Sequence, residues 1–522
     1  TLSGRAPLFD YLNSSSWPTP RSNARNQRRN SRDLAHQPDR TLYGFAKCLM
    51  SVGDYSRSRQ LLAEAYGLSP SDAQCSRMEE TLGDAAFGEG ELQQAYDHYL
   101  AGLSFGGQQV PRTTLARLWS IGTALAIHVI RDWFPAKADI TAGDDEEFVI
   151  RLFSKASNVG MFISGPKIVW PLLLGINVGE RFQGNSALAR SYALYSVAAA
   201  TVGLQSRAAN YERRATDMMA ESNDFASKAA VKTFIGVSAF GQARHDLVER
   251  SCNNALTAFK RVSDKWLEHV ALFHLACGQY ASGRMDEAIV GAHETFLASY
   301  AVQGTRTNCA AYLLQRASEG LVDIDPYLER VVKKDGDTLS TCNLDKALGI
   351  SCLARQQTTL AIEHLERACQ RPRAAWLPNF HAVAGLPLLV GALRLRFEEL
   401  LPEDPQAAAK TLRRAWRLAR RGLWLCPYFP VEHAPALREY ALVAELRGRV
   451  RTAESFLQKS CSLAENQNAA FELAQSRYEL ARLRCKLKKL GAEDQLASAG
   501  DELAAFRQII RRGAERVAQI GF

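Results

Sequence analysis

The stretch SVGDYSRSRQLLAEAYGLSP, residues Ser51 to Pro70, decides the fold. Gly53 predicts a turn between two helices, and the proline at the end of the stretch predicts the stop of the second helix. Small residues at Ala46, before the turn, and Ser58, after it, would let the two helices approach closely. The stretch therefore fits one half of a helix–turn–helix unit, and the remaining question is whether that unit recurs.

A frame of about 34 residues fits the chain again at several places. Each copy keeps small residues where two helices would meet. Clear copies begin at Ser76, His269, Cys342 and Ala434, and looser ones begin near Ala189 and Ala229. Beyond residue 40 the sequence is rich in Ala and Leu and is broken by Gly or Pro at short intervals, which predicts many helices of about 12 to 18 residues. The fold class expected from these patterns is all-α.

These small and apolar positions resemble the tetratricopeptide repeat (TPR). The resemblance implies a right-handed superhelical solenoid of antiparallel helix pairs, with a concave face that binds peptides or partner helices. Near the C-terminus, Leu503, Phe506, Ile510 and Val517 would form the apolar face of a capping helix. The expected segments are a basic flexible arm or linker at 1–40, a repeat pair at 41–110, an irregular apolar helical segment packed inside the solenoid at 111–186, repeats at 187–300 and 301–485, and capping helices at 486–522.

A second resemblance lies in the order of three segments. They are VPRTTLARLWSIGTALAIHVIRDWF (Val110–Phe134), ARSYALYSVAAATVG (Ala189–Gly203) and PYFPVEHAPALREYALVAEL (Pro427–Leu446). Over about residues 41 to 485 the chain is similar to the helical-repeat tail of multidomain signalling ATPases, in which a nucleotide-binding module precedes the repeats and a kinase or class III cyclase module is often fused to it. Such a domain would have to lie before Thr1, because this chain contains no P-loop motif.

Composition sets further limits. The net charge of +9 favours acidic partners in general, but it is mild for 522 residues and does not by itself indicate nucleic-acid binding. No apolar run reaches the roughly 18 residues of a membrane span. The 11 cysteines are scattered without a C-x-x-C pair, which predicts a reducing compartment, either the cytoplasm or the matrix of an organelle. The arm, with Arg21, Arg25, Arg28, Arg29 and Arg32, is expected to be a linker, the alternative being a processed targeting remnant.

Motifs of catalysis are missing from the sequence. It has no G-x-S-x-G elbow, no H-E-x-x-H pair and no complete kinase signature, so we expect no enzyme activity, no cofactor and no metal in this chain. His128 lies in an apolar run and predicts a hydrogen-bonded core histidine rather than a catalytic base. The acidic run Asp144 to Glu147 predicts the start of a helix rather than a cation site, because carboxylates stabilise the N-terminal end of the helix dipole.

Two sets of residues are candidates for partner binding. In the first two repeats, the positions expected to face the groove are Tyr43, Lys47, Glu80, Asp84 and Phe87. Farther along, KTLRRAWRLARRGLW places four arginines within one helical stripe: Arg413, Arg417, Arg420 and Arg421. The stripe could meet phosphates or acidic peptides, or it could be a solvated helix face with Trp416 pointing inward.

The function expected from the repeats is that of a non-enzymatic scaffold that binds a protein partner, a peptide or a helix, in the groove. Its setting would be the partner-sensing tail of a signalling ATPase, kinase or cyclase, or a structural subunit of a larger assembly. The alternative is a nucleic-acid-binding helical-repeat protein that uses the Arg-rich arm and the Arg413 to Arg421 stripe.

Overall fold

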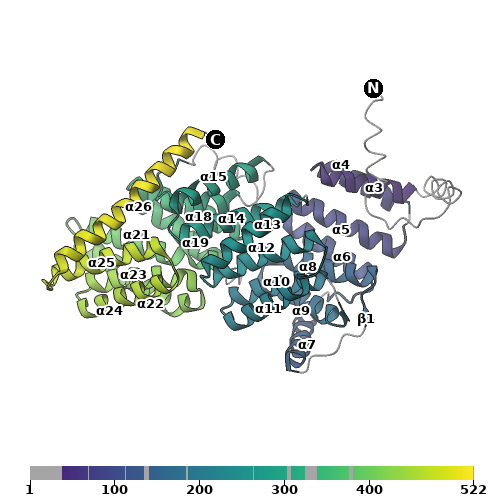
Figure 1. Ribbon diagram of the computed structural model, residues 1–522, viewed down its shortest axis with the longest axis horizontal. Coiled ribbons are helices and arrows are strands. Elements are labelled where there is room, and N and C mark those ends of the chain that lie inside the picture. Colours follow the sequence, from purple (N-terminus) through teal and green to yellow (C-terminus); the bar gives the residue numbers. More distant parts are fainter. Residues whose placement is uncertain are drawn as a thin grey trace. The chain divides into compact units, whose positions relative to one another are not determined.

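The computed structural model describes residues 38–68, 70–111, 113–133, 140–183, 186–262, 264–301, 307–323, 338–374 and 380–520 (Figure 1). They belong to two compact units, unit 1 (Thr1–Pro111) and unit 2 (Arg112–Phe522), which are treated separately below. The arm predicted at residues 1–40 lies outside the described residues except for its last three positions, 38–40.

Unit 1 consists of two helix pairs. Its helices are α3 (Pro38–Ser51), α4 (Tyr55–Tyr66), α5 (Asp72–Gly88) and α6 (Leu92–Phe105). Gly53 and Gly90 stand in the two turns at φ of 82°, a left-handed conformation that glycine adopts without a steric cost. The hydroxyl of Ser58 donates a hydrogen bond of 3.0 Å to the carbonyl oxygen of Ala46. The close approach predicted from these two small residues is therefore confirmed.

Unit 2 continues the same architecture with longer helices. Those in its first half are α7 (Thr114–Trp133), α8 (Asp144–Ile163), α9 (Gly165–Gly179), α10 (Ser186–Thr201), α11 (Gln205–Met219), α12 (Phe225–Gly241), α13 (His245–Phe259), α14 (Lys265–Ala281), α15 (Met285–Ala301) and α16 (Thr307–Ala317). The short strands β1 (Ile140–Thr141) and β2 (Phe182–Gln183) pair in parallel. Successive helices such as α10 and α11, or α12 and α13, pack as pairs along the chain.

The second half of unit 2 follows the same rule. Its helices are α18 (Thr338–Ala354), α19 (Thr358–Ala374), α20 (Phe380–Val383), α21 (Gly385–Leu400), α22 (Pro405–Leu425), the 3₁₀ turn η1 (Cys426–Tyr428), α23 (Pro430–Leu446), α24 (Val450–Asn466), α25 (Ala470–Lys486) and α26 (Ala492–Ile520). The pairs are α18 with α19, α21 with α22, α23 with α24, and α25 with α26. The protein is all-α apart from the two short strands among its described residues, and its repeats are TPR-like, as predicted.

In three of the repeats, a glycine of the first helix lies against a side chain of the second helix. A Cβ atom at Gly83 would lie 2.5 Å from the ring of Tyr99, and one at Gly349 would lie 2.7 Å from Cγ of Leu365. At Gly236 the neighbour is the sulfur of Cys252, 2.6 Å away. In all three pairs the partner follows the glycine by the same number of residues. The small residue thus marks one fixed crossing point within each repeat.

The last helix returns to an early one. Leu503, Ile510 and Val517 of α26 are buried, and α26 packs on α15 as well as on its pair mate α25 (Figure 1). Gly513 makes this approach possible, since a Cβ there would lie 2.9 Å from the side chain of Ile289 in α15. The superhelix of unit 2 therefore closes on itself, and α26 covers a helix far away in sequence.

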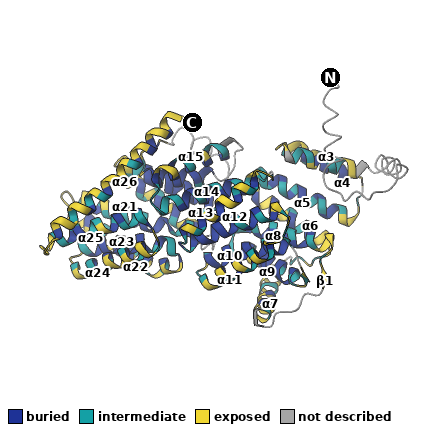
Figure 2. Ribbon diagram, viewed as in Figure 1, coloured by how far each residue is buried: buried dark blue, intermediate teal, exposed yellow. Residues whose placement is uncertain are grey.

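The segment after unit 1 differs in part from the expectation of a buried apolar insert. The acidic run Asp144 to Glu147 forms the first turn of α8, which confirms the predicted helix start. His128 of α7 is buried and lies 3.0 Å from the hydroxyl of Tyr211, which confirms a hydrogen-bonded core histidine. Packing inside the solenoid was a wrong expectation for one face of α7, because this face remains exposed (Figure 2).

One helical stretch among the described residues, Phe380–Leu400, is long and apolar enough to cross a membrane. Within unit 2, 67% of its 18-residue apolar window is buried, and Leu389, Val390 and Leu393 belong to the core. Burial by other helices of the same unit is what a core helix shows, because an apolar helix surface is stabilised once it leaves water.

Candidate functional site

Two cavities open along the inner face of unit 2. They are lined almost entirely by the first helices of successive pairs, namely α12, α14, α16, α18, α21, α23 and α25. The larger cavity has a volume of about 260 Å³, and the smaller one about 50 Å³. The predicted concave face therefore exists in unit 2 as a surface built by many repeats, and most of its space is filled by the protein's own side chains.

The larger cavity is lined by both apolar and charged side chains. Leu388, Leu395, Pro435 and Phe471 are among the apolar lining residues. The charged lining residues are Arg316, Glu319, Arg394, Arg438, Glu439 and Glu472. Such a surface offers burial to an apolar side chain and directed hydrogen bonds to polar groups beside it.

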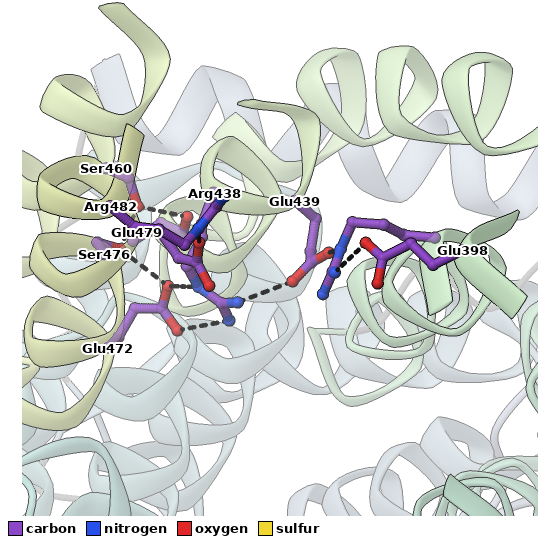
Figure 3. A network of polar contacts seen from close by, with 10 residues as sticks. Glu398, Arg438, Glu439, Ser460, Glu472, Ser476, Glu479 and Arg482 are labelled. Atoms are coloured by element: carbon purple, nitrogen blue, oxygen red, sulfur yellow. Dashed lines mark hydrogen bonds and ion pairs between the residues drawn. The ribbon is translucent and has the colours of Figure 1, made fainter. Parts of the chain in front are cut away.

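Arg438 lies at the centre of a network of polar contacts (Figure 3). Its guanidinium donates to both carboxylate oxygens of Glu472, at 2.8 and 3.3 Å, and to Glu439 at 2.7 Å. Ser476 extends the network by donating to Glu472 at 3.3 Å. Burial opposes the charge on Arg438, but the carboxylates of Glu472 and Glu439 outweigh it and raise the pKa of Arg438 above its ordinary value. The group is held permanently charged at the junction of α23 and α25.

A second buried pair joins helices far apart in sequence. Arg316 of α16 donates to both oxygens of Glu432 in α23, at 2.9 and 3.3 Å. It also donates to the hydroxyl groups of Tyr312 at 2.6 Å and Tyr280 at 3.2 Å. Burial works against the charge of Arg316, while the carboxylate of Glu432 more than compensates and raises its pKa. The pair ties the middle of unit 2 to its end.

Lys346 of α18 is a third cation in this interior. Its side chain is fully buried, with Nζ 3.6 Å from the ring centroid of Tyr312 and a hydrogen bond to the carbonyl oxygen of His381. Burial lowers the pKa of Lys346 below its ordinary value. A lysine of this kind can serve as a nucleophile or base only where a substrate reaches it. Complete burial makes a structural role the better interpretation.

The charged groups are engaged in mutual hydrogen bonds, and no group of three metal-ligating side chains occurs among the residues described by the structure. Helical repeats of this type are generally non-catalytic surfaces for protein–protein interaction. A ligand that entered the larger cavity would meet fixed charges of both signs beside apolar side chains.

The predicted groove residues of unit 1 lie on α3 and α5. Lys47 is exposed, and its Nζ lies 5.8 Å from the ring centroid of Tyr43. Glu80 is buried, and Asp84 accepts a hydrogen bond of 2.8 Å from the hydroxyl of Tyr99 within the same repeat. Phe87 is half-buried on α5. Their role in partner binding stays a prediction.

The predicted arginine stripe lies on α22. Arg413, Arg417, Arg420 and Arg421 are exposed, and they share the outer side of the helix. Trp416 points the other way: it is buried and stacks on Tyr440 with ring centroids 4.9 Å apart. The solvated-face interpretation with an inward Trp416 is thus the arrangement in the structure, and it leaves the arginines accessible to an anionic partner.

The sequence analysis missed the charged residues of the inner face. Arg438 and Glu472 belong to neighbouring repeats and are separated by 34 residues, the length of one TPR unit. Opposite charges at the same position of consecutive repeats were the signal that would have found them. Arg316 and Glu432 are separated by 116 residues, and their contact depends on the closure of the superhelix.

Comparisons with known proteins identify no near relative. No family model matches the chain, and no curated protein matches it. Solved structures with similar folds include a Rap protein complexed with Competence and Sporulation Factor (11% identity, covering 78% of this chain and 99% of that one, TM-score 0.36). Others are the APC/C hetero-tetramer Cut9–Hcn1 (14%, 90% and 85%, 0.33) and yeast Tom70 (12%, 90% and 93%, 0.33). Identities and TM-scores this low add no argument about function, so the likeness to TPR proteins rests on the helix pairs themselves.

Proposed function

We propose that this TPR-like helical-repeat protein is a non-enzymatic scaffold that binds a segment of a protein partner in the larger inner cavity of unit 2. The observation that carries the proposal is the cavity of about 260 Å³, which is lined by the first helices of successive repeats. Its apolar lining residues would take an apolar side chain of the partner, and Arg394 and Glu439 would meet polar groups beside that side chain.

The setting in the cell belongs to the same proposal. A chain that only binds partners acts through them, either as the sensing part of a signalling ATPase, kinase or cyclase or as a subunit of a larger assembly. All 11 cysteines are unpaired, which favours a reducing compartment such as the cytoplasm or an organelle matrix.

Gly391 provides the test. It lines the larger cavity, and a Cβ there would lie 3.4 Å from the carboxylate of Glu439, an ordinary contact. Gly391→Leu should therefore fill the cavity without breaking the fold. Gly500→Leu is the matched control, because Gly500 also lies inside a helix and a Cβ there would meet nothing within 4 Å.

The measurement is a selection of displayed peptides on the full chain, followed by affinity measurements on the two variants. Selected peptides should lose affinity at least about 30-fold with Gly391→Leu, as expected when a buried anchor side chain is excluded, and should bind Gly500→Leu as they bind the parent chain. Equal binding to both variants would contradict the proposal, as would hydrolase, kinase or cyclase activity in the isolated chain.

A second candidate function is binding of nucleic acid or another polyanion by α22. It is favoured by the four exposed arginines of the stripe, together with Trp424, which is 72% exposed at the end of the same helix. Phosphate contacts release counterions, so such binding should weaken steeply from low to physiological salt, and Arg417→Glu with Arg420→Glu should abolish it. Negligible affinity for RNA and DNA at low salt would dismiss this function.

A further inference from the structure

Helix α7, at the start of unit 2, turns its polar side toward the neighbouring helices α9 and α11. The carbonyl oxygen of Ala124 accepts a hydrogen bond of 2.9 Å from Asn177 of α9, and Ser120 accepts one of 2.9 Å from the indole of Trp170. Arg131 donates to the carbonyl oxygen of Asn177. His128, also on this side, meets Tyr211 of α11. Hydrogen bonds and one half-buried arginine thus hold α7 against α9 and α11.

The opposite side of α7 is apolar and exposed. Its large side chains, with the exposed fraction of each, are Leu115 (80%), Leu118 (57%), Trp119 (77%), Leu125 (44%), Val129 (37%) and Ile130 (59%). From Leu115 to Ile130 the only charged residue is Arg117, which is half-buried. A helix on the surface of a domain ordinarily turns its apolar side inward, so α7 has the reverse arrangement. An apolar patch of this extent marks a surface that is covered by a partner.

The spacing along α7 identifies the shape of that partner. Leu115, Trp119, Gly122, Ala126 and Val129 follow one another in alternating steps of four and three residues. An apolar repeat with this average spacing lines up on one side of a helix and suits a second helix packed along it. The partner surface is therefore a helix rather than an isolated side chain.

The pattern is complementary to itself when two copies run in opposite directions. With the symmetry axis at Ala124, Gly122 of one copy meets Ala126 of the other, and Trp119 meets Val129. Small residues then lie at the centre of the contact, where the helices approach most closely, and large ones lie toward both ends. A Cβ at Gly122 would meet nothing within 4 Å in the single chain, so this glycine has no packing role there. An uncharged surface also meets its own copy without repulsion.

Other parts of the described chain offer no matching surface. In unit 1 the exposed large apolar residues are Val52, Leu68 and Phe105, which lie at or beyond the ends of helices and form no stripe. Those of unit 2 outside α7 are scattered; for example, Leu360 lies on α19 and Leu487 directly follows α25. We propose that the exposed face of α7 is the interface of a homodimer, in which two copies of α7 pack antiparallel around a two-fold axis near Ala124.

Trp119 and Trp424 give a matched pair of variants for the full chain. Both are exposed to a similar extent, 77% and 72%, on different helices of unit 2. Trp119→Glu places one carboxylate in each copy, so two carboxylates enter the interface if α7 pairs with itself. We expect the dimer dissociation constant from sedimentation equilibrium to rise about 100-fold or more for Trp119→Glu and to stay unchanged for Trp424→Glu.

Gly122→Leu sharpens the test, because it adds bulk only where the second copy would lie. It should leave the single chain folded and weaken the dimer. A parent chain that is monomeric at all concentrations would overturn the proposal. So would a Trp119→Glu variant that expands or unfolds a monomeric chain, since α7 would then be covered by another part of the same chain. A dimer that both Trp119→Glu and Gly122→Leu leave intact would place the interface elsewhere and would equally refute it.

Discussion

The inner face of the repeats and the outer face of α7 distribute charge in opposite ways within unit 2. Inside, Arg438, Glu472 and Glu439 are largely withdrawn from water and bind one another. Outside, Leu115 and Trp119 are exposed to water with no charged neighbour on their own side of the helix. Both arrangements cost free energy when left alone, because an unpaired buried charge and an exposed apolar stripe are each unfavourable.

The two surfaces differ in what offsets this cost in free energy. The charges of the inner face are compensated within the chain, since every carboxylate of the network meets an arginine of the same or a neighbouring repeat. The apolar residues of α7 have no such compensation among the described residues of the chain. The inner face should therefore respond to mutation through stability, and the outer face of α7 through association.

The largest expected effect on stability comes from breaking the inner network. Glu472→Ala would leave Arg438 without the carboxylate that it contacts through two nitrogen atoms, and we expect the free energy of unfolding of unit 2 to fall by about 3–5 kcal/mol. Denaturant titration measures this loss. The control is Asp217→Ala, which breaks an ion pair with Arg213 whose side chains are 65% and 68% exposed and should cost at most about 0.5 kcal/mol. Equal losses for both variants would show that the inner network adds nothing beyond a surface pair.

The contrast also explains what the sequence could predict. Gly53, Ser58 and the glycines that meet residues such as Tyr99 are local features, because each repeat must bring its two helices together in the same way. These features specified the all-α, TPR-like fold. The Arg316–Glu432 pair depends on how many repeats close the superhelix, which no single repeat encodes.

For α7 the sequence predicted an apolar segment but not which side of the helix is exposed. The sequence from Val110 to Phe134 showed an apolar segment, but hydrophobicity does not reveal which side of a helix is covered by its own chain. The side became clear once Asn177 and Trp170 were seen to hold the polar side of α7. The exposure of the four arginines on one side of α22 could be predicted from their spacing, while their role in binding stays a prediction.

The second effect, smaller than the first, is a pH dependence of stability at the inner face. Burial lowers the pKa of His245, which lines the smaller cavity, to about 4. The folded protein thus favours neutral His245, and this contribution to stability is complete above the ordinary pKa of 6.5 and is lost as the pH falls toward 4. The loss should be about 3 kcal/mol, measured by unfolding at several pH values.

His245→Gln should flatten that pH profile, because glutamine does not titrate. Burial also lowers the pKa of His381, so part of the acid sensitivity should remain in the variant. The self-association of α7 should not change over the same pH range, since its outer face carries no titratable group between Leu118 and Ile130. An unchanged profile in His245→Gln would show that this histidine is protonated equally in the folded and unfolded states.

The smallest expected effect is a change in monomer stability at Gly122, which can be measured separately from the association of two copies of α7. Gly122 lies inside the helix with open space around it, so Gly122→Ala should raise the free energy of unfolding of the monomer by about 0.5–1 kcal/mol. Gly448 also has open space around it but adopts φ of 73° in a turn, so Gly448→Ala should lower stability by about 1 kcal/mol. Thermal unfolding at low protein concentration measures both.

If Gly122→Ala stabilised the monomer and weakened the dimer at once, the same glycine would be shown to be unfavourable for the helix and favourable for the contact between two copies. A loss of monomer stability would instead mean that α7 is packed against another part of its own chain at this position.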